Sequence, residues 1–486
     1  MCPSRGWLLA CLVARASAAC SEPVDAGQVR IVATSLCPQI FAPAPKTGEE
    51  DCLRGQQGPS HFGGRFQQIQ VRAVSYVPRP IGVASGAKDV YTAAFKRIHQ
   101  RDLYLIAKVL KANAVKLEPW DSKEDHQEFL QLCRDLGLFV IPTFDLKYFF
   151  QDEWLKRNSL EREKEMLKHF DEMLRSVLNK DPVLAWTVNY ALLLNETIAK
   201  TPKDSWKEKD PTGRREIYFD MITKLRQGHY RREWQEDDQS FMRPFLLPLD
   251  LDSRISQTDV AWYMAFAETY WGTWPKDSKD AKEQKKLSAF GAFDGWIAVT
   301  KPPSSQSGVD ATKDQATVLQ KLAGESSGTP SQTAFPECLQ DPSGGGCFYK
   351  SKKVKILQYG FAALQQLKIS SKGYLKMEVD SNFQQTALAD VWKYTNLKPA
   401  QKKVECDVVG AVVDEWVDDW DRCAAERGLP SNPFSQNIGG VCDDIAHDKR
   451  RHMEWFGLNA QYDAFGTFVG FLKIGRRSLA LSGLRQ

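Results

Sequence analysis

The strongest constraint on the fold is an alternation of two patterns that starts near Gln68. Short apolar runs rich in β-branched residues alternate with longer runs whose apolar residues recur three and four positions apart, which is helical spacing. Strands that alternate with helices form parallel βα units, because two parallel strands need a long crossover connection. The sequence therefore predicts an α/β protein with a parallel sheet.

Eight candidate strands follow one another along the chain. They are IQVRAVSY (69–76), AVKLEPW (114–120), FVIPTFDL (139–146), VLAWTVNY (183–190), FLLPLDL (245–251), DGWIAVT (294–300), GYLKMEV (373–379) and VVGAVVDEW (408–416). Eight βα units close a (β/α)8 barrel, or TIM barrel. A doubly wound sheet is the main alternative, but no glycine-rich nucleotide-binding motif follows any of these strands. We therefore predict a TIM barrel over residues 67–475.

The remaining segments are given separate roles. Residues 1–19 hold the apolar run WLLACLVA after Arg5 and small residues near Ala18, which predicts a cleaved signal peptide and a secreted or cell-wall protein. A mitochondrial-type presequence and an uncleaved anchor are the alternatives. Residues 20–66 are an N-terminal extension, 302–346 a flexible Ser/Gly/Pro-rich insertion after strand six, and 476–486 a C-terminal tail. No later apolar run is long enough to span a membrane.

Charge and motif content exclude several functions. The 65 basic and 61 acidic residues nearly balance, so the chain lacks the basic field that nucleic-acid binding needs. No CxxC pair and no HExxH motif occurs, so neither a metal site nor a cofactor is predicted.

Nine of the eleven cysteines lie after the expected signal peptide. Short loops could be closed by pairing Cys37 with Cys52, Cys338 with Cys347, and Cys423 with Cys442, as in an oxidising compartment. Cys133 lies on the apolar face of a predicted helix, so we expect a buried thiol there.

In a barrel of this kind the chemistry lies where the strands end. Those ends are SYVPRPIG, KLEPWD, TFDLKYF, TVNYALLLNE, LPLDLD, AVTKP, MEVDSN and DEWVDDWD. Their order resembles the catalytic barrel of the clan of retaining glycoside hydrolases that includes β-1,3-glucanosyltransferases and the β-galactosidase/β-glucuronidase group. The resemblance covers most of the chain, from VRAVSYVPRPIG to MEWFGL. It implies a hydrolase or transglycosylase acting on β-linked polysaccharide, with β-1,3-glucan as the first choice.

Retaining hydrolysis requires two carboxylates about 5 Å apart. The resemblance makes Glu378 the nucleophile, with Asp380 as the alternative if the register differs. The family ends strand four with Trp-x-x-Gly-Asn-Glu, whereas here Asn189 is followed by Tyr190 and Ala191. Asn189 could still bind the sugar 2-hydroxyl and Tyr190 could contact the ligand, but the proton donor is missing from its expected place.

The segment VVDEWVDDWDR sets acidic residues between two tryptophans. A pyranose ring stacks on an aromatic plane, and carboxylates accept its hydroxyl hydrogens. The resemblance makes Trp416 the floor of the glycone subsite and places Glu415 on its rim. A tryptophan buried under the barrel mouth and a solvated acidic turn are the alternatives.

Three further residues at strand ends are candidates for the site. Asp145 and Trp120 could contact sugar, and Tyr76 could shape the loop above strand one.

Other departures from the family pattern favour a second hypothesis. Lys116 stands where the family usually has arginine, and no glycine follows Glu378 as in the usual Glu-Phe/Tyr-Gly. The alternative is therefore a catalytically inactive, glycosidase-like protein that binds carbohydrate or serves in a wall or surface.

Overall fold

The structure is a computed structural model of the chain. It describes residues 30–33, 38–45, 62–78, 89–118, 120–150, 154, 158–177, 182–189, 211–232, 243–250, 292–300, 354–360, 364–369, 375–379, 384–388 and 409–416. Residues 1–19, 302–346 and 476–486, and the six cysteines expected to pair, lie outside these ranges.

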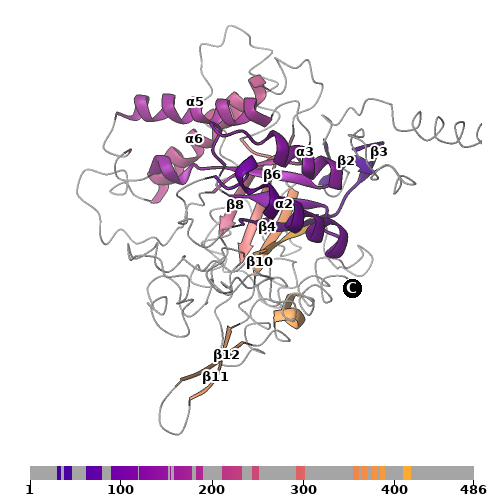
Figure 1. The fold of residues 1–486 in the computed structure, drawn as a ribbon. Helices are drawn as coiled ribbons and strands as arrows, with labels where there is room; N and C mark the ends of the chain where they lie inside the picture. Colours follow the sequence, from indigo (N-terminus) through magenta and orange to yellow (C-terminus); the bar gives the residue numbers. More distant parts are fainter. Residues whose placement is uncertain are drawn as a thin grey trace, which may run out of the picture.

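Eight parallel strands close into one barrel, which confirms the predicted (β/α)8 fold (Figure 1). The strands are β4 (Val71–Tyr76), β5 (Ala114–Leu117), β6 (Phe139–Phe144), β7 (Trp186–Val188), β8 (Phe245–Asp250), β9 (Gly295–Thr300), β10 (Val354–Gly360) and β13 (Gly410–Asp414). Around the barrel they run β10, β13, β4, β5, β6, β7, β8 and β9, so that β9 closes on β10.

The seventh strand of the barrel is β10, and the prediction that GYLKMEV takes this place is wrong. Within GYLKMEV, β12 (Leu375–Val379) pairs antiparallel with β11 (Leu364–Ile369) in a separate two-stranded sheet, which projects from the barrel in Figure 1. Every residue of β10 is buried. That pattern is typical of a parallel strand covered on both faces.

Helices cover the outside of the barrel. They are η2 (Ala93–Phe95), α2 (Lys96–Tyr104), a π-helical turn η3 (Leu105–Val109), α3 (Gln127–Leu136), α5 (Ser159–Val177) and α6 (Pro211–Tyr230). Gly137 ends α3 in the left-handed region with φ 71°, the stop that its position predicts. No helix within the described ranges combines the length and the apolar character needed to cross a membrane.

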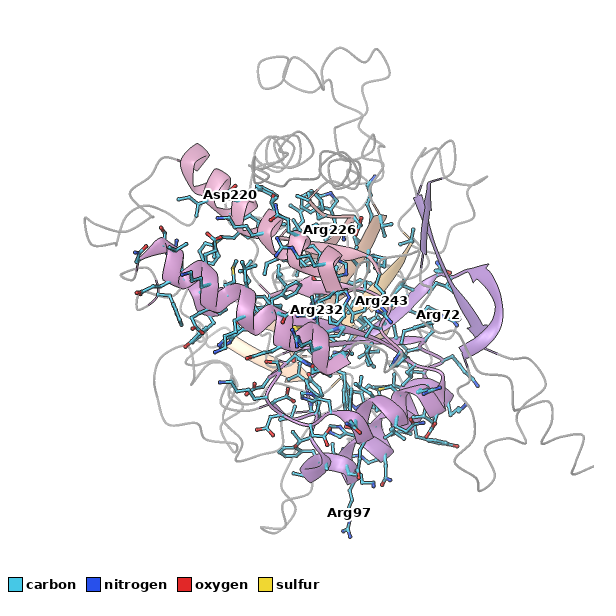
Figure 2. All side chains as sticks on the ribbon, turned by 90° about the horizontal axis from the view of Figure 1, so that it is seen from above. Arg72, Arg97, Asp220, Arg226, Arg232 and Arg243 are labelled. Carbon is cyan, nitrogen blue, oxygen red and sulfur yellow. The ribbon has the colours of Figure 1, made fainter. Side chains whose placement is uncertain are left out.

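Ion pairs join α5 to α6 on the outer surface. Lys224 Nζ lies 2.5 Å from Glu163 Oε2, and Arg232, just after α6, forms an ion pair with Asp171. Figure 2 shows Arg232 and Asp220 in this region. The two helices therefore cover the barrel as a linked pair.

The core has two layers, because alternate residues of each strand point in opposite directions. Val71, Ala73 and Ile356 belong to a cluster inside the barrel, whereas Val74 and Leu357 pack against the helices. The outer layer contains Cys133, which is fully buried as predicted. A Cβ on Gly410 would lie 2.6 Å from the Val71 Cα, so only glycine allows β13 to lie this close to β4.

An antiparallel sheet precedes the barrel. It contains β1 (Arg30–Ala33), β2 (Pro38–Pro45) and β3 (Phe62–Gln68), in that order. Most of it falls within the expected N-terminal extension.

Candidate functional site at the barrel mouth

A layer of polar side chains lies inside the barrel at its carboxyl-terminal mouth. Each member is two residues beyond a residue of the inner apolar cluster, so it points inward as well. The layer consists of Ser75, Lys116, Thr143, Thr187, Gln358 and Asp414, all 6% exposed or less. Buried polar groups cost free energy unless they are hydrogen-bonded, so this layer is a candidate for ligand binding.

Gln358 and Asp414 form a buried pair on the neighbouring strands β10 and β13. Gln358 Nε2 donates to Asp414 Oδ1 at 2.8 Å. Gln358 Oε1 is buried and has no hydrogen-bond partner in the described part of the chain. The pair therefore leaves one buried acceptor unused among the described residues.

Gln358, and not Glu378, lies near the end of the seventh barrel strand. The family ends strand seven with Glu-Phe/Tyr-Gly, and β10 ends with Gln358, Tyr359 and Gly360. At the end of the seventh barrel strand, where the resemblance predicts a carboxylate, the chain therefore has Gln358, an uncharged amide. The dipeptide Tyr359-Gly360 is the signal that could have found this strand in the sequence.

Glu378 lies on β12, outside the closed barrel. The argument that placed it at the end of the seventh barrel strand therefore no longer holds. Its role as a nucleophile stays a prediction. Asp380, Tyr190 and Ala191 lie outside the described residues.

The structure brings Asn189 and Asp145 together where β7 and β6 end. Asn189 Nδ2 donates to Asp145 Oδ1 at 2.6 Å, and Asn189 Oδ1 accepts from the Lys147 backbone N–H at 2.9 Å. The amide of Asn189 therefore holds the loop after β6 in place. The second amide hydrogen of Asn189 is not used in either of these two hydrogen bonds.

Lys116, at the place of the family's arginine, is buried and forms an ion pair with Glu118 on the same strand end. The Glu118 side chain is 37% exposed. The buried ammonium charge is therefore balanced within β5 and its exit loop.

Trp416 does not form the floor of an open subsite, and that prediction is wrong. Its side chain is fully buried, and its backbone N–H donates to the Ser75 carbonyl at 3.0 Å. One residue that interacts with Trp416 is the buried Asp102 of α2. Burial raises the pKa of Asp102, and its interactions with Arg101, Trp416 and Tyr76 offset only part of that rise. Trp416 is thus the core tryptophan that was the alternative.

Glu415, next to Trp416, is half-buried. Its place on the rim of a sugar subsite therefore stays a prediction.

Tyr76 is also buried, on the outer face of β4. Its hydroxyl lies 3.0 Å from His99 Nδ1, and its ring stacks on Phe129 at 6.3 Å. Burial lowers the pKa of His99 to about 4. Tyr76 therefore packs against α2 and α3, away from a ligand in the barrel mouth.

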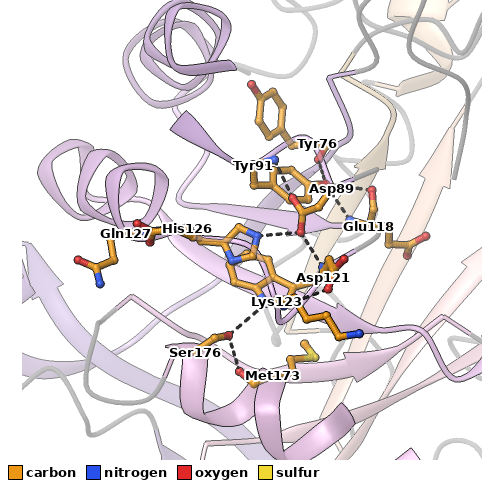
Figure 3. A network of polar contacts seen from close by, with 12 residues as sticks. Tyr76, Asp89, Tyr91, Glu118, Asp121, Lys123, His126, Gln127, Met173 and Ser176 are labelled. Atoms are coloured by element: carbon orange, nitrogen blue, oxygen red, sulfur yellow. Dashed lines mark hydrogen bonds and ion pairs between the residues drawn. The ribbon is translucent and has the colours of Figure 1, made fainter. Parts of the chain in front are cut away.

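Trp120 is not an exposed sugar platform, because it is buried against His126, which belongs to the polar network around Asp89 that Figure 3 shows. It is 5% exposed, and its ring stacks on that of His126 with the centroids 3.8 Å apart. His126 Nε2 lies 2.7 Å from Asp89 Oδ2, which also accepts from the Asp121 backbone N–H at 2.6 Å. No sequence motif marks Asp89, yet its carboxylate joins the loops that follow β4 and β5.

The closed parallel barrel defines the class of the protein as a (β/α)8 barrel. No protein-family model matches the sequence, and no curated protein matches it. Among the described residues, no group of three or more His, Cys, Asp or Glu is placed to hold a metal ion.

Similar solved structures are glycoside hydrolases. A β-glucuronidase from Ruminococcus gnavus has 10% identity and a TM-score of 0.47, over 94% of this chain and 52% of that one. A GH2 β-galacturonidase from Eisenbergiella tayi has 12% identity and a TM-score of 0.44, over 87% of this chain and 52% of that one. A β-glucuronidase from Bacteroides uniformis has 13% identity and a TM-score of 0.40, over 73% and 31%. The chain thus spans about half the length of these proteins, or less.

Proposed function

We propose that this protein is a glycosidase-like barrel that binds a β-linked polysaccharide, β-1,3-glucan as the first choice, without hydrolysing it. The observation that carries the proposal is Gln358, which stands at the end of the seventh barrel strand and donates to Asp414. An amide has no negative charge with which to attack an anomeric carbon.

The surroundings of Gln358 favour binding over chemistry. A retaining mechanism requires a second carboxylate about 5 Å from the nucleophile, as proton donor. The described residue that follows β7 is Asn189, whose side chain is bonded to Asp145 and to the Lys147 backbone. Without a proton donor, turnover of an unactivated sugar falls by roughly 10²–10⁴.

A sugar hydroxyl matches the unused acceptor at Gln358 Oε1. A hydroxyl is both donor and acceptor, so it can satisfy this oxygen and still accept from a neighbouring group. The apolar segment within residues 1–19 supports secretion, so the ligand we propose is a wall or extracellular glucan.

The test combines binding with product analysis on the purified full chain. Laminari-oligosaccharides are titrated while intrinsic fluorescence is followed, and parallel samples with aryl β-glycosides are analysed by mass spectrometry. Aryl glycosides are included because a good leaving group does not need the missing acid. We expect binding and no product. Absence of binding to every saccharide would overturn the proposal.

A Glu378→Gln variant tests the hydrolase hypothesis in the same assay. Turnover by the wild-type chain that this variant loses would identify a retaining glycosidase with Glu378 as its nucleophile. Turnover that the variant keeps would place the reaction elsewhere in the barrel and would equally overturn a purely binding role.

A further inference from the structure

The rim above β6 carries an exposed aromatic ring next to polar groups. Tyr148, on the 3-10 turn η4 (Lys147–Phe150), is 38% exposed. The neighbouring aromatic side chains Phe149, Phe150 and Trp154 are 8% exposed or less. Tyr148 is thus the member of this aromatic cluster that is open to solvent.

The position of Tyr148 is fixed by a hydrogen bond to Asp145, which is in turn bonded to Asn189. Its backbone N–H donates to Asp145 Oδ1 at 3.2 Å, and the same oxygen accepts from Asn189 Nδ2 at 2.6 Å. The backbone N–H of Asn189 donates to the Phe144 carbonyl at 3.0 Å. The loop after β6 is therefore held to the end of β7 before any ligand arrives.

Packing also orients the Tyr148 ring. It meets Phe149 edge to face at 5.2 Å and Trp154 at 5.6 Å. A ring supported in this way loses little conformational entropy on binding, which favours affinity.

We infer that Tyr148, Asp145 and Asn189 form a second sugar subsite, so that the ligand is an oligosaccharide rather than a single sugar. The inference rests on the proposed function and extends it. The tyrosine ring offers an apolar face for the C–H face of a pyranose, and its hydroxyl remains in water. Asp145 accepts from sugar hydroxyls, and Asn189 donates its remaining amide hydrogen to one.

The order of the strands supports two separate subsites. β6 and β10 are four strands apart in the closed ring of eight, so Asp145 and Gln358 lie on opposite sides of the mouth. Side chains on opposite sides of the mouth can contact different rings of one oligosaccharide. The chemistry favours a neutral sugar at this subsite, because the Asp145 carboxylate repels an acidic sugar.

The test measures the dissociation constant for glucose and for laminari-oligosaccharides of increasing length, by calorimetry on the full chain. Wild type is compared with Tyr148→Ala and Tyr148→Phe. Tyr104→Ala is the matched control, because Tyr104 is 54% exposed on the outer helix α2. Thermal unfolding confirms that each variant is folded.

We expect wild-type affinity to rise with chain length and Tyr148→Ala to weaken long oligosaccharides about tenfold. Tyr148→Phe and Tyr104→Ala should keep wild-type affinity, and glucose binding should be the same in all four proteins. Unchanged affinity of Tyr148→Ala for long oligosaccharides, or an equal loss for glucose, would overturn the second subsite. A wild-type chain that binds no saccharide would instead overturn the proposed function.

Discussion

Both oxygens of a carboxylate at the amino-terminal end of the barrel are hydrogen-bonded, whereas two oxygens at the mouth are not. At the amino-terminal end, Asp294 precedes β9 and uses both carboxylate oxygens. Arg226 on α6 donates to Oδ1 at 2.8 Å and lies 2.7 Å from Oδ2, which also accepts from the Phe245 backbone N–H at 2.8 Å. Figure 2 shows Arg226 on α6. At the mouth, Gln358 Oε1 and Thr143 Oγ1 are buried and have no partner among the described residues.

This difference separates groups that stabilise the fold from groups available to a ligand. A buried charge that is paired on both sides is costly to disturb, whereas an unpaired buried acceptor already lowers stability. In TIM barrels the amino-terminal face serves stability and the carboxyl-terminal face carries function. The four predictions below test whether this division holds here.

Replacing Arg226 with methionine should have the largest effect. The change leaves the Asp294 carboxylate, 17% exposed, without its cationic partner. Removing one partner of a buried ion pair costs about 3–5 kcal/mol in the free energy of unfolding. Urea unfolding measures this change.

Arg97→Met is the control for that variant, because Arg97 points into solvent from α2 (Figure 2). Its effect should stay within about 0.5 kcal/mol. Equal effects of the two substitutions would remove the evidence for a stabilising amino-terminal end.

The second prediction concerns His99, which packs behind the mouth end of β4. Burial lowers its pKa from the ordinary value of 6.5 to about 4. As the pH falls from 6.5 to about 4, the unfolded chain binds a proton before the folded one, so stability falls. The loss reaches roughly 3 kcal/mol. A His99→Phe variant should lack this component of the pH dependence.

The measurement is urea unfolding of wild type and variant at several pH values in that window. The raised pKa of Asp102 acts in the opposite direction. The protonated Asp102 stabilises the folded chain at low pH, and this contribution is lost as the pH rises through the pKa that Asp102 has in the folded chain. The difference between the two proteins therefore isolates His99. Parallel pH profiles would contradict the prediction.

Gln358→Glu should have a smaller effect, with a distinct pH signature. The new carboxylate would lie near Asp414 Oδ1, which Gln358 Nε2 now contacts at 2.8 Å. Two carboxylates in one site raise the pKa of one of them. The variant should therefore lose about 1–2 kcal/mol relative to wild type as the pH rises from about 4 to 8.

Gln358→Met is the companion variant, since it removes both polar atoms and adds no titratable group. Its stability difference from wild type should not depend on pH. If Gln358→Glu behaves in the same way, Gln358 and Asp414 are not coupled.

Much of the fold could be predicted from the sequence, because most barrel strands carry a local signal. β6, for example, is buried throughout and follows a helix that ends at Gly137. Hydrophobic pattern alone could not choose the seventh strand, because GYLKMEV and VKILQYG have similar lengths and polarity, and only the dipeptide Tyr359-Gly360 distinguishes the second segment. Local periodicity does not tell a parallel barrel strand from one strand of an antiparallel pair.

The site could be predicted only where residues lie directly at strand ends. Asp145 and Asn189 directly follow β6 and β7, and the structure brings them into contact, while their role in binding stays a prediction. Trp120 and Trp416 were misjudged because sequence does not determine whether a tryptophan after a strand points into solvent or into the core. Asp89 was missed, since its partners come from residues 91, 121 and 126.

The smallest predicted effect tests the division between the two ends most directly. Thr143→Val replaces a buried hydroxyl, which has no partner in the described residues, with a methyl group of similar size. Removing an unsatisfied polar group should raise the free energy of unfolding by up to about 1 kcal/mol. Thr223→Val is the matched control, because Thr223 is equally buried and its Oγ1 donates to the Phe219 carbonyl at 2.8 Å.

The control should lose about 1 kcal/mol, so the two substitutions are expected to change stability in opposite directions. Urea unfolding without ligand measures both. A stabilised Thr143→Val protein would show that the mouth keeps a polar group at the expense of the fold, as expected of a residue retained for a ligand. Equal destabilisation by the two variants would mean that Thr143 serves the fold, and that the polar layer does not differ from the amino-terminal end.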